Sequence, residues 1–383
     1  MNMIYLDNNA TTKVSEEVVQ AMLPYFSEYY GNPSSMYAFA LPIASAIKKA
    51  RQQVAQLLNA NSSEIIFTSG GTESDNTAIF GTLAAFPHKK HIIVSAIEHP
   101  AVLNIAEELQ RRNYEVTIIP VDHNVLIDPR EIEKAIRPDT AIVSVMWANN
   151  ETGTIIDIEA ITKIVKSKNV LMHTDAVQAA GKLSIDLQKV PVDLLSLSGH
   201  KLHAPKGVGA LYAREGTRIR PFLMGGHQEH GRRAGTENVQ GIVGLGVACE
   251  QAFQEFQEKN QKITFLRDKL EKKLLEKIPH SHVNGSTEHR VNNTTNIAFE
   301  FVEGESILLM MSDAGICASS GSACTSGSLE SSHVLRAAGI PAELAHSAVR
   351  FSLSKYNTES EIDYVIETLP GIIAKLRAMS PFA

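Results

Sequence analysis

The sequence predicts an α/β protein with a mainly parallel sheet covered by helices. Through the middle of the chain, short β-branched runs, polar or glycine-rich turns and amphipathic stretches follow one another repeatedly. This alternation is typical of parallel strands that are joined by helical crossovers. The predicted strands are 64–68, 91–96, 116–120, 140–147, 170–174 and 193–198. The predicted helices are 43–58, 72–85, 101–112, 129–136 and 158–167.

The length of the chain predicts two domains in one subunit. At 383 residues it exceeds the size at which a single hydrophobic core stops growing. We expect a large α/β domain at 14–255 and a small α+β domain made of 1–13 and 256–383. A charged amphipathic stretch from about 246 to 277 predicts one long helix that joins them. Beyond it lie the predicted strands 296–301 and 348–353 and the predicted helices 305–314 and 358–379.

Composition and charge exclude several classes of protein. Hydrophobic residues make up 44% of the chain and charged residues 20%, as in ordinary globular proteins. A net charge of -6 gives no general attraction to nucleic acid or to anionic lipid. Because no signal peptide and no long apolar run are visible, we expect a cytoplasmic protein without membrane contact. Cys249, Cys317 and Cys324 lack CxxC spacing, so we expect reduced thiols and no structural metal site.

Lys201 is the first candidate for chemistry. The segment SLSGHKLHAPKGVGALY places Ser198, His200 and Lys201 at the end of a predicted strand, before a glycine-rich turn and a further strand. A partly desolvated lysine beside a phosphate site suits a Schiff base, since burial keeps its amine nucleophilic. Taken alone, such a lysine is more often a surface residue of a turn. The neighbouring motifs favour the functional interpretation.

The segment HTDAVQ supplies an acid and an amide at another strand end. A lysine that binds pyridoxal phosphate (PLP) is typically partnered by an acid that keeps the pyridine nitrogen protonated, and Asp175 fits that need. The alternative role for Asp175 is a helix N-cap. Gln178 could donate a hydrogen bond to the phenolic oxygen of the cofactor.

Three further strand ends carry polar side chains. The turn TSGGTESDN opens a helix, where the N–H groups near Gly71 and the hydroxyl of Thr72 suit a phosphate; Thr72 could instead cap the helix in a capping box. The segment IEHPAV places His99 where it can stack on a flat ring, although a lone histidine is more often structural. Asn150 lies in WANNETG, after the next strand. Polar groups at one edge of an α/β sheet predict a ligand site there.

Two features concern the substrate. Arg350 lies in the apolar strand AVRFSL, where its guanidinium suits the α-carboxylate of an amino acid; an inter-domain salt bridge is the alternative. Cys324 lies in ASSGSACTSG, a segment with little to bury, so we expect its thiol to be accessible and able to reach a target. Cys249, in the helical VACEQAF, is predicted to be a core residue.

Together these segments closely resemble the cysteine desulfurases of the NifS/IscS type, in the class V aminotransferase group of fold type I PLP enzymes. The resemblance spans nearly the whole chain, and GGHQEHGRRAGTEN and SACTSGSLE are most similar to the NifS branch. It is carried by YLDNNATT, GNPSS, TSGGTESDN, EHPAV, NNETG, HTDAVQ, SGHK, GRRAGTEN and SSGSACTSG. The resemblance implies a large domain with a mainly parallel seven-stranded sheet flanked by helices, and a smaller α+β domain.

The resemblance also implies roles for single residues. Lys201 forms the Schiff base with pyridoxal 5'-phosphate, Asp175 binds the pyridine nitrogen, and His99 stacks on the ring as a catalytic residue. Gln178 faces the phenolic oxygen. The phosphate is held by Gly71, Thr72, Ser198, His200 and, from the second subunit of a homodimer, the partner subunit's Thr236.

The implied activity converts L-cysteine to L-alanine. Asn150 and Arg350 match residues that hold substrate and cofactor oxygens, and Cys324 matches the cysteine that takes up the sulfur as a persulfide. The acceptor is an iron–sulfur scaffold or another protein, with nitrogenase metalloclusters as one destination. At most, Cys324 would be a transient ligand of an iron–sulfur cluster.

The sequence departs from the family pattern at Tyr37, Ala40 and Ser331, to which no catalytic role falls. Two other activities remain open. One is a related PLP lyase or aminotransferase, such as a selenocysteine lyase or a serine-type aminotransferase, and Cys324 argues against the aminotransferases. A binding module that presents sulfur or iron to a scaffold would need the thiol but no turnover.

Overall fold

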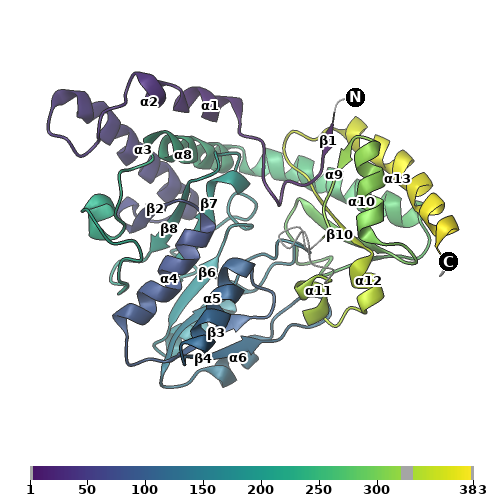
Figure 1. The fold of residues 1–383 in the computed structure, drawn as a ribbon, viewed down its shortest axis with the longest axis horizontal. Coiled ribbons are helices and arrows are strands. Elements are labelled where there is room, and N and C mark those ends of the chain that lie inside the picture. The colour runs from purple at the N-terminus through teal and green to yellow at the C-terminus, as the bar shows by residue number, and fades with distance from the viewer. Residues whose placement is uncertain (1–2, 321–330, 381–383) are drawn as a thin grey trace.

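The computed structural model describes residues 3–320 and 331–380 and is built around a seven-stranded sheet (Figure 1). The sheet order is β2-β8-β7-β6-β5-β3-β4, and β8 runs antiparallel to both its neighbours while the other pairs are parallel. The prediction of a mainly parallel seven-stranded sheet is confirmed. In chain order the strands are β2 Ile65–Thr68, β3 His91–Ser95, β4 Glu115–Ile119, β5 Thr140–Ser144, β6 Leu171–Asp175, β7 Leu194–Ser198 and β8 Gly209–Ala213.

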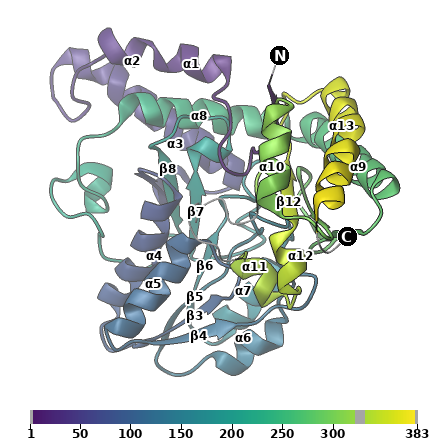
Figure 2. The same cartoon turned by 45° about the vertical axis from the view of Figure 1, so that its right-hand side comes forward.

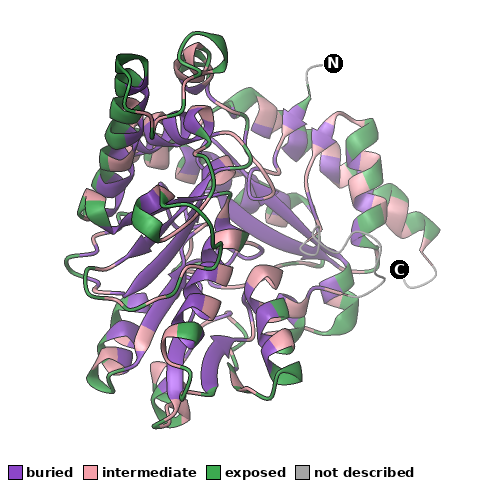
Figure 3. Ribbon diagram, turned by 60° about the vertical axis from the view of Figure 1, so that its left-hand side comes forward, coloured by how far each residue is buried: buried purple, intermediate pink, exposed green. Residues whose placement is uncertain are grey.

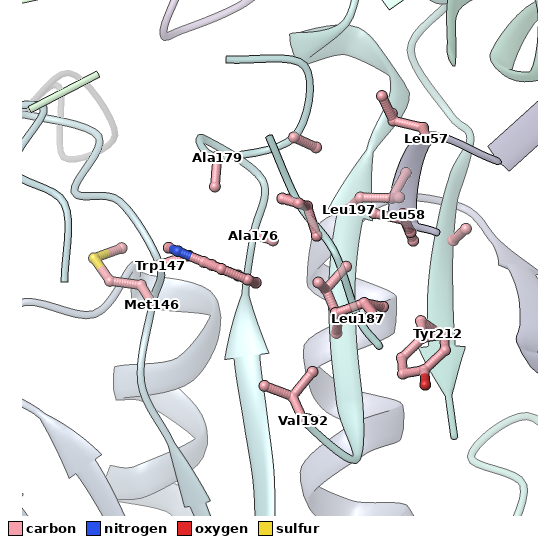
Figure 4. Close-up of a cluster of buried hydrophobic side chains, with 14 of the residues drawn as sticks. Leu57, Leu58, Met146, Trp147, Ala176, Ala179, Leu187, Val192, Leu197 and Tyr212 are labelled. Carbon is pink, nitrogen blue, oxygen red and sulfur yellow. The ribbon is translucent and has the colours of Figure 1, made fainter. Parts of the chain in front are cut away.

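Helices cover both faces of this sheet, so its inner strands are buried along almost their whole length, polar residues included. Only the edge strand β4 exposes side chains, whereas β2, β3, β5, β7 and β8 are buried at every residue (Figure 3). Trp147, Leu197 and Tyr212 belong to the larger core cluster (Figure 4). The helices of this part are α1 Glu16–Met22, α2 Pro24–Ser27, α3 Leu41–Leu58, α4 Gly71–Ala85, α5 Pro100–Arg111, α6 Pro129–Ala135, α7 Ile158–Ser167 and α8 Val239–Gln254. Its 3-10 helices are η1 Ala38–Ala40, η2 Ser62–Glu64, η3 Gly199–Lys201 and η4 Gln228–Gly231.

The C-terminal part has a sheet and a core of its own. Strand β10 (Thr294–Phe299) lies antiparallel between β12 (Ala348–Ser352) and β9 (Ser281–Val283), and helices α9, α10 and α13 gather beside it (Figure 2). Its helices are α9 Phe256–Lys277, α10 Gly304–Asp313, α11 His333–Ala337, α12 Ala342–His346 and α13 Glu359–Met379. None of the helices formed by the described residues is long and apolar enough to cross a membrane.

The N-terminus joins this second core. Strand β1 (Ile4–Tyr5) pairs in parallel with β11 (Ile316–Cys317), and Leu6 is buried in the same apolar cluster as the inner faces of α9 and α13. We propose the domain division 14–255 against 1–13 with 256–383 on these separate cores.

The prediction of one helix from about 246 to 277 is wrong. The structure has two helices there, α8 and α9, which meet at Glu255. Helix α8 is largely buried, while α9 buries one stripe and has a polar remainder. Neither proline nor glycine marks the break, and the Glu255 carboxylate accepts a bond from Lys355 in the C-terminal part instead. A tertiary contact of this kind leaves no local signal in the sequence.

Helices α3 and α8 pack closely, and one glycine allows their approach. A Cβ atom on Gly246 would lie 2.6 Å from the Cα of Ala50 and 2.5 Å from the Oε1 of Gln53. Gly371, inside α13, has nothing within 4 Å of such an atom. The two glycines therefore offer a matched comparison of the same substitution.

We expect Gly246→Ala to lower the free energy of unfolding by about 1–3 kcal/mol, because the backbone of α3 cannot move away cheaply. Gly371→Ala should raise it by up to about 1 kcal/mol through helix propensity alone. Urea unfolding followed by circular dichroism measures both. Equal effects of the two substitutions would refute the close packing at Gly246.

Candidate active site

The carboxyl ends of β6 and β7 bring the predicted cofactor residues together. Asp175 is the last residue of β6, Ser198 is the last of β7, and Lys201 ends the 3-10 turn η3 that follows. Since β6 and β7 are parallel neighbours, both ends lie at one edge of the sheet. The charge of Lys201 acts on Asp175, His99 and His200, so these four groups form one cluster.

The Lys201 amine also contacts the N-terminal segment. Its Nζ donates to the main-chain oxygens of Asn9, at 2.5 Å, and of Ala10, at 2.6 Å. The His200 ring lies 3.2 Å from the hydroxyl of Thr11, and Thr12 donates to the His200 carbonyl through both its N–H and its hydroxyl. The segment that precedes α1 therefore forms one side of the cluster.

Asp175 has the environment that a protonated ring nitrogen needs. Its carboxylate is buried, with one oxygen accepting the Val177 N–H at 2.8 Å. The alternative role of Asp175 as a helix N-cap is wrong, because a turn and no helix follows β6. The other oxygen makes no hydrogen bond within the described part of the chain. Burial raises the pKa of Asp175 to about 6, and the nearby charge of Lys201 opposes that rise. A cation placed against the second oxygen would stabilise the ionised form.

Both histidines of the cluster are uncharged at neutral pH. Burial and the charges of Lys201 and His333 lower the pKa of His99 to about 4. His99 caps α5, and its Nδ1 accepts the Ala101 N–H at 3.1 Å, so the ring proton lies on Nε2. Burial and the charge of Lys201 likewise lower the pKa of His200 to about 4. A neutral imidazole can lie against an aromatic ring without the cost of a buried charge.

The start of α4 can bind a phosphate through main-chain N–H groups, because Gly71 leaves this position without a side chain. A Cβ atom on Gly71 would lie 2.8 Å from Val177 Cγ2 and 3.6 Å from the Cβ of Ser198, so only glycine fits there. The first N–H groups of a helix have no acceptor within it, and a phosphate would satisfy them. The alternative role of Thr72 as the cap of this helix is wrong. Gly70 is the N-cap, and Glu73 accepts the Ser69 N–H at 2.8 Å.

Arg350 and Asn150 lie at the opposite side, where the C-terminal part meets the sheet. Arg350 is 3% exposed and donates to the Asn150 carbonyl at 3.0 Å. It also forms an ion pair with Asp7 at 2.7 Å, so Arg350 is a salt-bridge residue, although the pair lies within the proposed small domain and is not the inter-domain bridge that the alternative interpretation named. Its buried Nε has no hydrogen-bond partner among residues 3–320 and 331–380. One donor of the guanidinium thus remains for a ligand.

Thr236 is the one described candidate that lies apart from this cluster. It is exposed and lines a cavity of about 110 Å³ together with Ser69 and Arg233. Gly71, Thr72, Ser198 and His200 do not line that cavity. Arg233 forms an ion pair with Glu73 at 2.9 Å, which ties this segment to the start of α4.

Cys324 lies outside the described residues, but both flanks of its segment are described. On one side Ser319 exchanges two main-chain hydrogen bonds with Arg350. On the other side the Ser332 hydroxyl donates to the buried carboxylate of Glu151. The segment therefore begins and ends beside Arg350 and the Asn150–Glu151 turn. Cys249 is fully buried, as predicted, and burial raises the pKa of its thiol to about 12.

Sequence reasoning missed two residues that hold the cluster together. Asn9 was noted only as part of YLDNNATT, yet its carbonyl accepts from both Lys201 and Gln178. Lys182 donates to the side chains of Asn9 and Gln178. The spacing of four residues between Gln178 and Lys182 was the only local feature of the sequence that could have indicated their contact. In the part of the chain that the structure describes, no group of three or more His, Cys, Asp or Glu side chains could hold a metal ion.

The donor set fits pyridoxal phosphate. The free oxygen of Asp175 suits the ring nitrogen, the neutral His99 suits the ring face, and the start of α4 suits the phosphate.

Comparison with known proteins agrees with this chemistry. Residues 4–365 match the model of the family "Aminotransferase class-V". The cysteine desulfurase NifS of Azotobacter vinelandii is 55% identical over 380 residues, which cover 99% of this chain and 94% of that protein.

Two solved structures extend the comparison. The structure of a NifS-like protein aligns with a TM-score of 0.92 and 40% identity, covering 98% of this chain and all of the other. The structure described as SspA in complex with cysteine aligns with a TM-score of 0.82 and 36% identity, covering 93% of this chain and 100% of the other. The chain belongs to the class-V aminotransferase family and, within it, to the cysteine desulfurases.

Proposed function

We propose that this chain takes sulfur from L-cysteine with pyridoxal phosphate bound at Lys201, holds it as a persulfide on Cys324 and releases L-alanine. The observation that carries the proposal is the cluster of Lys201 with a buried Asp175 and an uncharged His99 at adjacent strand ends. Membership of the cysteine desulfurases supports the choice of reaction within this class of enzymes.

The cofactor residues would have distinct tasks. When bound, pyridoxal phosphate supplies an electron-withdrawing ring that makes the α-proton of an attached amino acid acidic. Asp175 would keep a proton on the ring nitrogen, and its burial strengthens that interaction. Lys201 would hold the cofactor covalently and then carry the α-proton. The Asn9 and Ala10 carbonyls orient its amine.

Arg350 and Asn150 would hold the substrate carboxylate. Nε of Arg350, without a hydrogen-bond partner among the described residues, is the donor left for it, and the bond of Nη2 to Asp7 keeps the side chain in place. Such a charge-assisted bond is stronger than a neutral one. Cysteine as the substrate is supported by the structure of SspA, which contains cysteine, in a fold that matches this one.

Cys324 would accept the sulfur. As its thiolate attacks the substrate sulfur, an S–S bond forms and the Cβ–S bond breaks. The electron pair of that bond stays with the three-carbon product, which leaves as L-alanine after protonation. The flanks of its segment are bound at Arg350 and Glu151, and this supports a position near the substrate. The persulfide would then supply iron–sulfur cluster assembly through a scaffold or another acceptor protein.

The sharpest test is the fate of the sulfur. Cys324→Ala should lower sulfide release from L-cysteine by at least about 100-fold, because the nucleophile is lost. The visible absorbance of the bound cofactor should remain, since Lys201 and Asp175 are unchanged. Mass spectrometry after incubation with L-cysteine should find one added sulfur atom on Cys324 of the wild type. Cys249→Ala, in the core, serves as the matched control and should keep the activity.

Two results would contradict the proposal. Unchanged sulfide release by Cys324→Ala would remove the persulfide from the mechanism. Wild-type protein that binds no pyridoxal phosphate when it is supplied would remove the cofactor chemistry altogether.

We also propose that the chain acts as a homodimer in which the partner subunit's Thr236 completes the phosphate site. Thr236 is exposed and is not among the residues at the start of α4 in its own subunit. The segment 23–41 exposes an unusual set of large apolar side chains, the kind of surface that a subunit interface covers. They are Leu23, Phe26, Tyr29, Tyr30, Met36, Tyr37, Phe39 and Leu41.

If this apolar surface forms the subunit interface, the oligomeric state in solution depends on it. Tyr30→Asp combined with Met36→Asp should convert a dimer into a monomer, because both positions are among the most exposed of the set, at 74% and 100%. Buried unpaired charges at an interface cost several kcal/mol. Light scattering after gel filtration measures the mass, with Phe265→Asp on α9 as the control. A monomeric wild type, or a double variant that stays dimeric, would contradict the assignment.

A further inference from the structure

Lys182 contacts two residues of the active site, Asn9 and Gln178, and the role of its amine there needs an explanation. It is partly buried and, with Lys201 and Lys259, lines a cavity of about 30 Å³ between the sheet and the C-terminal part. Its Nζ donates to Oε1 of Gln178 at 2.5 Å and to Oδ1 of Asn9 at 3.0 Å. Both acceptors are side-chain amides.

An ion pair does not explain this position. A lysine that leaves water is usually paired with a carboxylate. Lys182 has no acidic partner in the described chain, and the nearest charges that act on it are those of Lys201, Lys259 and Arg350. Burial and these cations lower the pKa of Lys182 well below that of a free lysine. An ammonium group has three N–H donors and an amine two, so either form can make both bonds.

Lys182 fixes the orientation of the Gln178 amide. As an ammonium group Lys182 can only donate, and as an amine it still has an N–H for the oxygen, which is the end of Gln178 that faces it. At the other end, Nε2 donates to the Asn9 carbonyl at 3.0 Å, and a carbonyl can only accept. The two bonds together place the NH₂ end of Gln178 on the side of Lys201, whose Nζ shares the same carbonyl.

Lys182 also holds the residue that contacts Lys201. The side-chain oxygen of Asn9 accepts from Lys182 and, at 3.1 Å, from Asn293. The Asn9 Nδ2 donates to the Asn150 carbonyl at 3.0 Å and to Thr294 at 2.8 Å. With every polar atom of its side chain bound, Asn9 presents its carbonyl to Lys201 in a single position.

We propose that Lys182 is a positioning residue of the reaction, which holds Gln178 with its NH₂ end toward the cofactor's phenolic oxygen and Asn9 with its carbonyl toward Lys201. The inference rests on the proposed function, because Gln178 needs a cofactor oxygen to face. A purely structural lysine would tie the N-terminal segment to the sheet without affecting the cofactor.

The test is the pH dependence of the cofactor's visible absorbance in the purified, loaded protein. An N–H donor beside the phenolic oxygen stabilises negative charge there, so its loss makes the proton of the Schiff-base linkage harder to remove. Lys182→Met should therefore move the midpoint upward by about one pH unit. It should also weaken binding of pyridoxal phosphate to the apoprotein by about tenfold. The other titratable groups around Lys201, left in place, are Asp175, His99 and His200.

Two variants separate positioning from structure. Lys182→Arg keeps the donors and should return the midpoint to within a few tenths of the wild-type value. Lys189→Met, at an exposed lysine paired with Asp186, should leave the midpoint unchanged. If Lys182→Met does not fold, Lys182→Gln, which keeps one amide donor, should give a smaller upward shift.

Each outcome has one meaning. An upward shift in Lys182→Met or Lys182→Gln that Lys182→Arg reverses supports the positioning role. A folded Lys182→Met or Lys182→Gln variant with the wild-type midpoint overturns it, as does a failure of Lys182→Arg to restore the midpoint. If the wild type itself shows no cofactor absorbance, the proposed function fails, and that result is distinct from either of these.

Discussion

The site depends on one buried residue, Asn9, which joins three parts of the chain. Its main-chain N–H donates to the Ser352 hydroxyl of β12, its side chain bonds the Asn150 carbonyl and Lys182, and its carbonyl accepts from Lys201. It is 2% exposed, so each of these bonds is costly to lose. Together with the bonds of Arg350 to Asp7 and to the Asn150 carbonyl, this contact holds the N-terminal segment, the sheet edge and the C-terminal part against one another.

Burial sets the charges around this contact. Two more buried acids, Glu98 and Asp75, lie close enough to Asp175 to be affected by its charge. Burial raises the pKa of Glu98 to about 8 and that of Asp75 well above its usual value. Burial therefore favours the protonated form of both, whereas Asp175, with a pKa of about 6, ionises more readily than Glu98. Because His99 and His200 are neutral, the charged groups that remain beside Lys201 are Asp175 and, on the side of the C-terminal part, the ion pair of Arg350 with Asp7. That arrangement suits a cofactor that carries both a phosphate and a protonated ring.

Local patterns in the sequence predicted the sheet and most of its helices. Helix 158–167 was predicted with the bounds that the structure gives it, since Asp157 caps it and its apolar residues repeat at helical spacing. The strand ends that carry Asp175 and Lys201 were equally visible. The break at Glu255, the Asp7 partner of Arg350 and the contacts of Asn9 were not, because each joins residues far apart in the chain. Tertiary packing determines these contacts, and the hydrophobic periodicity of the sequence does not predict them.

The proposed function requires that Lys201, and no other lysine, carries the cofactor. Lys182 and Lys259 line the same cavity, and burial lowers the pKa of both, that of Lys259 to about 8, so each is a rival amine. Borohydride reduction of the protein loaded with pyridoxal phosphate, followed by peptide mass spectrometry, distinguishes them. We expect a cofactor adduct on Lys201 alone. An adduct on Lys182 or Lys259, or none at all, would contradict it.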